Sequence, residues 1–260
     1  MGRGVPARVR RAPNLRRYPA RAMDPGPDTP HAPPGVPFRI RDAVFVWMAA
    51  IVVGTTAAGI ALGITGDDAA DPGWAVTASG VVGQFATIGF GAWVVSRVRG
   101  SGSLRRDVGL TLRGRDWWAV PAGVGAMLGL ALVILPLVTL VDERQRVVED
   151  LETATGPELA VLAVTAALLA PLFEEVLFRG LLLRALLRRM GPGAAIWVSA
   201  VAFGVVHLLD PSLGTLVRVP ALVGFGLLAG HRAVRTGSLS QPVLLHFGFN
   251  LLTVGFALSG

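Results

Sequence analysis

Long uncharged stretches alternate with short charged segments along most of this chain. Each stretch is long enough, or nearly so, to cross about 30 Å of hydrocarbon as a helix. They lie at Ala43–Ile64, Trp74–Val95, Trp117–Val141, from Leu159 onward, and at Gly193–Leu209, Ser212–Gly230 and Pro242–Ser259. Because backbone groups in hydrocarbon must be hydrogen-bonded within their own segment, each stretch is predicted to be helical. The predicted fold class is all-α: a polytopic transmembrane bundle of about seven helices.

The charged segments between these stretches alternate in sign and so predict an orientation. Residues 1–41 are rich in Arg, 65–73 hold three Asp, 96–116 hold six Arg, and 142–157 are net acidic. The alternation continues to the C-terminus. Basic residues gather on the cytoplasmic side of membrane proteins, so the N-terminus is predicted to be cytoplasmic.

Composition supports a membrane protein and excludes several other classes. Charged residues make up only 16% of the chain, against about 25% in soluble domains. There is no Cys, which excludes disulfides, thiolate metal sites and a Cys nucleophile. The net charge of +7 lies at the ends of apolar spans, so nucleic-acid binding is not expected. All 24 basic residues are Arg, which favours a bacterial source and hence the bacterial plasma membrane.

The chain divides into two regions of different composition. Residues 1–41 are rich in Arg and Pro without an apolar run, and they are predicted to be a disordered basic tail. Residues 42–260 are predicted to form one integral membrane domain.

Three polar clusters interrupt the apolar spans in the second half of the chain. They read E-E-x-x-x-R at Glu174, Glu175 and Arg179, F-x-x-x-H at Phe203 and His207, and H-x-x-x-N at His246 and Asn250. An ionisable side chain at membrane depth costs several kcal/mol, so it indicates a functional site by default. The set contains an acid/base, a second proton donor or acceptor, and groups able to hold an oxyanion.

Spacing predicts that the clusters meet. A turn at Met190–Gly193 separates two spans; Glu174 lies 17 residues before Gly191 and His207 lies 16 after it. At 1.5 Å per residue, these two side chains are at nearly equal height. His246 enters the membrane from the same side. Phe203 lies one turn before His207, on the same helix face.

Within the first cluster, Glu175 and Arg179 are four residues apart and can form an ion pair. Glu174 then forms no pair with Arg179 and is available as an acid or base. Each cluster alone also has a structural interpretation, as a buried ion pair or an interhelical hydrogen bond. Their joint occurrence at one depth favours a function.

The three motifs, in this order and each within an apolar span, resemble those of the CAAX protease and bacteriocin-processing (CPBP or Abi) family of intramembrane proteases. The resemblance covers residues 105–258, with its core at 158–258. It implies an endopeptidase that acts on a membrane-embedded or lipid-associated peptide or protein. The implied roles are Glu174 as the base that activates water with His207 beside it, Glu175 and Arg179 as organisers of the helix face, and His246 and Asn250 as oxyanion donors.

The resemblance leaves the cofactor open, since such enzymes are often labelled metalloproteases. Glu174, His207 and His246 would be the ligands if Zn²⁺ were bound with one open position. A glutamate–water mechanism explains the same residues without a metal, and we favour it slightly. The alternative to an enzyme is a non-catalytic immunity or scaffold protein of the bacteriocin-immunity type. A proton-coupled transporter is disfavoured, because no inverted repeat is evident.

Overall fold

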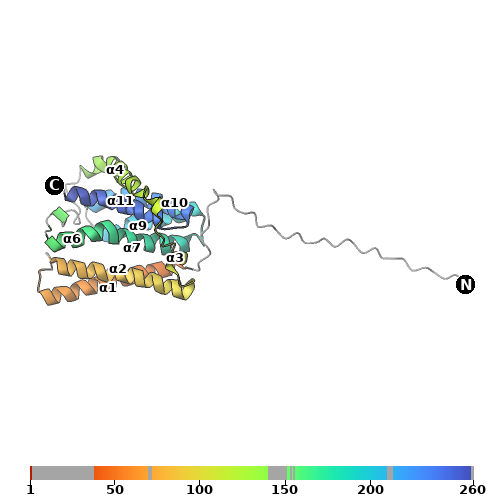
Figure 1. Ribbon diagram of the computed structural model, residues 1–260, viewed down its shortest axis with the longest axis horizontal. Coiled ribbons are helices and arrows are strands. Elements are labelled where there is room, and N and C mark those ends of the chain that lie inside the picture. Colours follow the sequence, from red (N-terminus) through yellow and green to blue (C-terminus); the bar gives the residue numbers. More distant parts are fainter. Residues whose placement is uncertain are drawn as a thin grey trace.

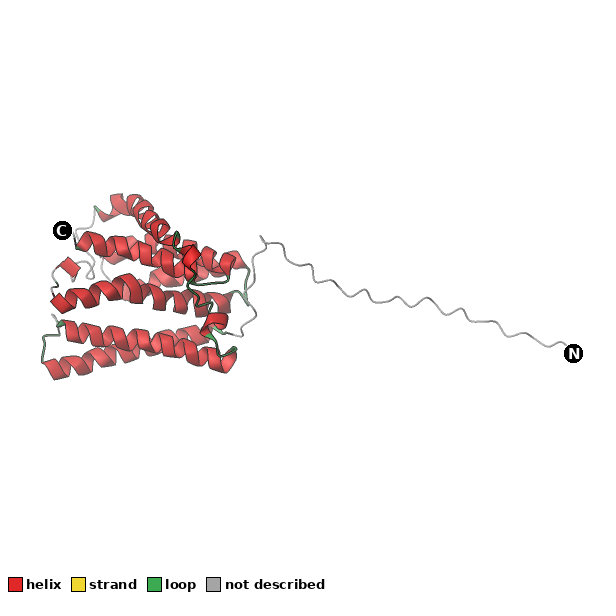
Figure 2. Ribbon diagram, viewed as in Figure 1, coloured by secondary structure: helices red, strands yellow, loops and turns green. Residues whose placement is uncertain are grey.

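The computed structural model of the chain describes Met1 and residues 38–69, 72–139, 151–152, 154, 156–209 and 213–258. In these ranges every regular element is helical and no strand occurs, which confirms the all-α prediction (Figure 2). Residues 2–37 of the predicted tail lie outside the described residues, as do 140–150 and 210–212. The first helix begins at Ile40.

The helices form a bundle in which neighbours run up and down (Figure 1). The long ones are α1 (Ile40–Thr65), α2 (Trp74–Arg99), α4 (Ala119–Val138), α9 (Pro192–Val206), α10 (Leu213–Thr236) and α11 (Ser240–Ala257). Short turns of helix are α3 (Leu104–Asp107), η1 (Gly114–Asp116) and η4 (His207–Leu209).

One further long helix is continuous from residue 156 to residue 186 and contains two segments that are wound more widely. Its successive parts are α6 (Gly156–Val164), η2 (Thr165–Leu169), α7 (Ala170–Glu175), η3 (Val176–Leu182) and α8 (Leu183–Leu186). Both η2 and η3 are π-helical, with hydrogen bonds that reach one residue further than in an α-helix. Short π segments inside α-helices occur frequently at functional sites.

Six helical segments among the described residues are long and apolar enough to cross a membrane. They correspond to the first six predicted spans. The seventh corresponds to α11, which has 18 residues and includes Gln241, His246 and Asn250. It is not among the six. The chain is an integral membrane protein, and α11 packs along α4 inside the bundle.

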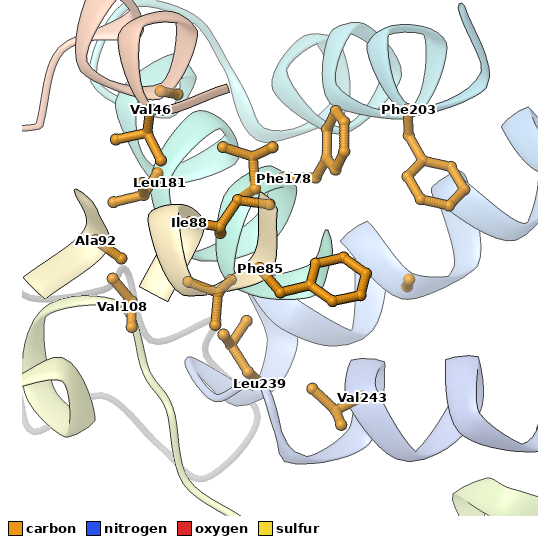
Figure 3. Close-up of a cluster of buried hydrophobic side chains, with 14 of the residues drawn as sticks. Val46, Phe85, Ile88, Ala92, Val108, Phe178, Leu181, Phe203, Leu239 and Val243 are labelled. Carbon is orange, nitrogen blue, oxygen red and sulfur yellow. The ribbon is translucent and has the colours of Figure 1, made fainter. Parts of the chain in front are cut away.

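The core lies where α1 and α2 meet the π segment η3. Phe85 and Ile88 of α2 are buried beside Phe178 and Leu181 of η3 (Figure 3). Leu239, at the start of α11, closes the same cluster. The segment with the Glu pair is therefore held by the N-terminal hairpin on one side and by the C-terminal helices on the other.

One end of the bundle is rich in arginine. Helix α1 starts there beside the end of α2, as the 2.7 Å ion pair between Asp42 and Arg99 shows. The α10–α11 turn is at the same end, because Leu239 donates its backbone N–H to Gly109. We call it the arginine-rich end. It holds Arg39, Arg41, Arg97, Arg99, Arg105, Arg106, Arg113, Arg115, Arg184, Arg188, Arg189, Arg232 and Arg235.

A buried carboxylate organises the loop at the arginine-rich end. Burial acts to raise the pKa of Asp107, but hydrogen bonds from the hydroxyls of Ser96 and Ser101 and from the backbone of Ser101 and Ser103 hold this pKa below its ordinary value. Asp107 therefore ties the end of α2 to the short helix α3.

Helices α4 and α11 approach each other through two glycines. A methyl group at Gly248 of α11 would collide with the carbonyl of Val120 in α4, and one at Gly123 of α4 with the carbonyl of Leu245 in α11. The contact is thus reciprocal, as in other small-residue interfaces between membrane helices. It fixes the height of α11, which carries His246.

We expect Gly248→Ala to lower the free energy of unfolding by about 1–3 kcal/mol, because the new methyl group overpacks a backbone contact. Gly255→Ala is the matched control: it lies in the same helix with no atom within 4 Å of the added carbon. Unfolding of both variants in detergent, followed by Trp fluorescence, measures the difference. Equal stability would contradict the close contact.

Candidate active site

A buried network joins Glu175, Arg179 and His246. Oε1 of Glu175 accepts a hydrogen bond of 2.9 Å from Nη1 of Arg179 and lies 3.0 Å from Nδ1 of His246. The side chains of Glu175 and Arg179 are fully buried. Nη2 of Arg179 donates to the carbonyl of Gly226 in α10, at 3.2 Å. One carboxylate thus connects the helix that carries it to both α10 and α11.

Glu174 has a different environment from its neighbour. Its side chain is 24% exposed, and its Oε2 lies 3.7 Å from Nε2 of His246. That distance exceeds a direct hydrogen bond. The ring of His246 therefore lies between two carboxylates, one paired with Arg179 and one not. The prediction from spacing that Arg179 pairs with Glu175 is confirmed.

The hydrogen bonds determine which nitrogen of His246 carries a proton in the neutral ring. Oε1 of Glu175 also accepts a hydrogen bond from Nη1 of Arg179, so in the neutral ring His246 is the donor, from Nδ1. Nε2 of the neutral ring is then an acceptor, and it faces Glu174. A neutral His246 with this bond has no N–H to offer an oxyanion.

Aromatic rings enclose the network. The ring of Phe225 in α10 lies 4.7 Å from the ring of His246, and that of Phe203 lies 5.6 Å from it. The guanidinium of Arg179 lies 4.6 Å from the centre of the Phe203 ring. Both phenylalanines are fully buried. Sequence reasoning found Phe203 but missed Phe225, because a Phe in an apolar helix carries no signal of its own.

His207 joins this arrangement through Phe203. Its Nδ1 donates to the carbonyl of Phe203 at 2.8 Å, and the two rings are 5.0 Å apart. Within the described part of the chain, His207 forms no hydrogen bond or ion pair with Glu174. Phe178 lies one helical turn after Glu174, and Phe203 lies one helical turn before His207. The rings of Phe178 and Phe203 are 5.3 Å apart, so the two helices pair in the register that the spacing predicted.

Asn250 contacts the first π segment. Its Nδ2 donates to the carbonyl of Ala166 in η2 at 2.8 Å. Similarly, the hydroxyl of Ser199 in α9 donates to the carbonyl of Phe178 in η3 at 3.2 Å. Each π segment therefore has one carbonyl that accepts a hydrogen bond from another helix. These bonds link the irregular parts of the long helix to α9 and α11.

The residues proposed as zinc ligands do not form a three-ligand group. No set of three or more His, Cys, Asp or Glu side chains suited to a metal ion occurs in the described ranges. Of the candidate ligands, Glu174 lies near His246, while His207 bonds to Phe203. This arrangement does not fit a tetrahedral site with one open position. We therefore derive no step through a metal.

Glu174 beside His246, inside membrane-length helices, is a candidate functional site. Residues 156–252 match the model of one family, described as type II CAAX prenyl endopeptidase Rce1-like. The match runs from α6 into α11 and includes all seven motif residues, while α1 to α4 lie outside it. The resemblance to CAAX proteases stated from the motifs is thereby confirmed. Comparisons with curated proteins and with solved structures gave no match.

Removing Arg179 should be more harmful than removing both partners of its ion pair. We expect Arg179→Met to lower the free energy of unfolding by about 3–5 kcal/mol, since Glu175 would become an uncompensated buried charge. The double variant Glu175→Leu, Arg179→Met should regain part of this loss. Arg235→Met, at an exposed position, is the control. Thermal unfolding in detergent compares them; a single variant as stable as the control would contradict the pairing.

Proposed function

We propose that the chain is an intramembrane endopeptidase that hydrolyses a peptide bond of a membrane-associated protein or peptide with water activated by Glu174. The observation that supports this most is that the two adjacent carboxylates, Glu174 and Glu175, have different environments. Glu175 is bound by Arg179 and His246, while Glu174 is partly exposed and its Oε2 lies 3.7 Å from Nε2 of His246. The family match supports a CAAX-type protease in general.

The geometry suits a single water held by two acceptors. Oε2 of Glu174 and Nε2 of His246 are 3.7 Å apart, so one water can donate a hydrogen to each. Its lone pair then points away from both, toward a substrate carbonyl. As the new C–O bond forms, Glu174 takes the proton; it returns the proton to the amine nitrogen as the C–N bond breaks.

This proposal exchanges the roles that the motifs implied for the two histidines. His246 is the neighbour of Glu174, and its Nδ1–H is held by Glu175. His207 would stabilise the oxyanion from Nε2 in its protonated form, because its Nδ1–H is bound to Phe203. Asn250 uses one Nδ2 hydrogen on Ala166 and has a second for the oxyanion.

Orientation follows from the arginine-rich end. Since basic residues gather on the cytoplasmic side, we place this end, and the N-terminus, in the cytoplasm of a bacterial cell. The Glu pair lies about three turns from Arg184 along its helix, so cleavage would occur within the membrane near the cytoplasmic leaflet.

We expect Glu174→Gln to reduce cleavage of a membrane-anchored peptide by roughly 10²–10⁴-fold, the usual contribution of a general base. Glu158→Gln, in the first turn of α6 and more than four turns before Glu174 in the same helix, is the control and should retain activity. Rates in proteoliposomes with a fluorogenic anchored peptide make the measurement. Equal rates for Glu174→Gln and wild type would exclude the assignment. A cellular phenotype that survives Glu174→Ala with His207→Ala would favour the immunity or scaffold alternative.

We further expect activity to persist after exhaustive chelation, and the purified protein to hold no stoichiometric metal. The physical reason is that, within the described ranges, the candidate ligands form no group of three suited to a metal ion. Elemental analysis, with activity before and after chelation, provides the measurement. One zinc per chain that is lost together with activity and restores it on re-addition would overturn this expectation.

A further inference from the structure

Four arginines surround an open cavity at the arginine-rich end. The cavity has a volume of about 310 Å³ and is lined by Phe38, Arg39, Arg99, Arg188 and Arg189. We call it the arginine pocket. Its volume is within the range of small-molecule sites. Its walls come from the start of α1, the end of α2 and the turn after α8, so it exists only because these three segments pack together.

The charged groups that line the pocket are all cationic. Asp42 pairs with Arg99 at 2.7 Å and also accepts the backbone N–H of Arg39 at 2.8 Å. Among the residues that line the pocket there is no carboxylate. An anion that enters the pocket would therefore meet several guanidinium groups at once. Guanidinium groups suit phosphate oxygens in particular, because they can donate two parallel hydrogen bonds.

The surroundings of the pocket are apolar on its membrane side. Phe38 is buried and forms part of the lining. Phe45, less than two turns beyond Arg39 along α1, is 68% exposed, and Val98, next to Arg99, is 73% exposed. In a membrane these exposed apolar side chains face lipid. A ligand in the pocket can therefore have its anionic group among arginines and an apolar part along α1 and α2.

We propose that the arginine pocket binds the phosphate headgroup of an anionic phospholipid of the leaflet at the arginine-rich end. Basic pockets between membrane helices on the cytoplasmic side suit such headgroups. The site is distinct from the Glu174 network, shares no residue with it, and does not depend on its chemistry. Bound lipid would join α1, α2 and the turn after α8, and so steady the hairpin that packs against η3.

The test compares two charge-matched variants of the full chain. The pocket variant is Arg39→Gln with Arg189→Gln; Arg99 is kept because it pairs with Asp42. The control is Arg105→Gln with Arg106→Gln, two exposed arginines on α3 at the same end but outside the pocket. Native mass spectrometry of detergent-purified protein measures the binding of phosphatidylglycerol and phosphatidylcholine with identical acyl chains. Inorganic phosphate is the third probe.

We expect the pocket variant to bind phosphatidylglycerol roughly thirtyfold more weakly than wild type, and the control to differ by less than about threefold. Binding of phosphatidylcholine should be weak in all three proteins. Equal weakening in both variants, or in neither, would overturn the proposal. Displacement of phosphatidylglycerol by inorganic phosphate at millimolar concentration would assign the pocket to a free phosphate instead and also overturn it. If the double variant does not fold, Arg189→Gln alone should weaken binding about fivefold.

Discussion

The carboxylate of Glu175 is the point on which the site and much of the bundle depend. One of its oxygens accepts hydrogen bonds from both Arg179 and His246. A charge buried among membrane helices is tolerated only when it is paired and hydrogen-bonded, so each partner must remain in position. Arg179 in turn requires the carbonyl of Gly226, and His246 requires α11 at a fixed height. The same contacts therefore pair the buried carboxylate and hold the helices in position.

The close helix contacts follow from that constraint. Gly226 lies so near the backbone of Ala200 that a methyl group there would come within 2.9 Å of it. Gly248 has the same relation to α4. Small residues allow the backbones to approach, and approach brings a carbonyl or a ring within reach of the buried polar groups. In this protein the glycines therefore set distances in the site, although none of them carries a functional group.

The sequence predicted the helical class, the first six spans and the identity of the polar clusters, because charge in an apolar span is a strong and local signal. It also predicted the pairing of Glu175 with Arg179, since four residues bring two side chains onto one helix face. It could not predict that His246, rather than His207, is the neighbour of Glu174, because that depends on the rotation of α11 about its axis. Phe225 and the two π segments were likewise hidden, as nothing in their composition distinguishes them from ordinary apolar helix.

Because η3 is π-helical, the direction in which Glu174 points depends on the number of residues in this part of the helix. A π turn accommodates one more residue than an α turn, so the helix before η3 is rotated relative to the helix after it. Loss of a single residue between Val176 and Leu182 would restore a plain α-helix and turn Glu174 by about 100° around the axis. An insertion or deletion of one residue in this stretch would therefore turn the carboxylate of Glu174 away from His246.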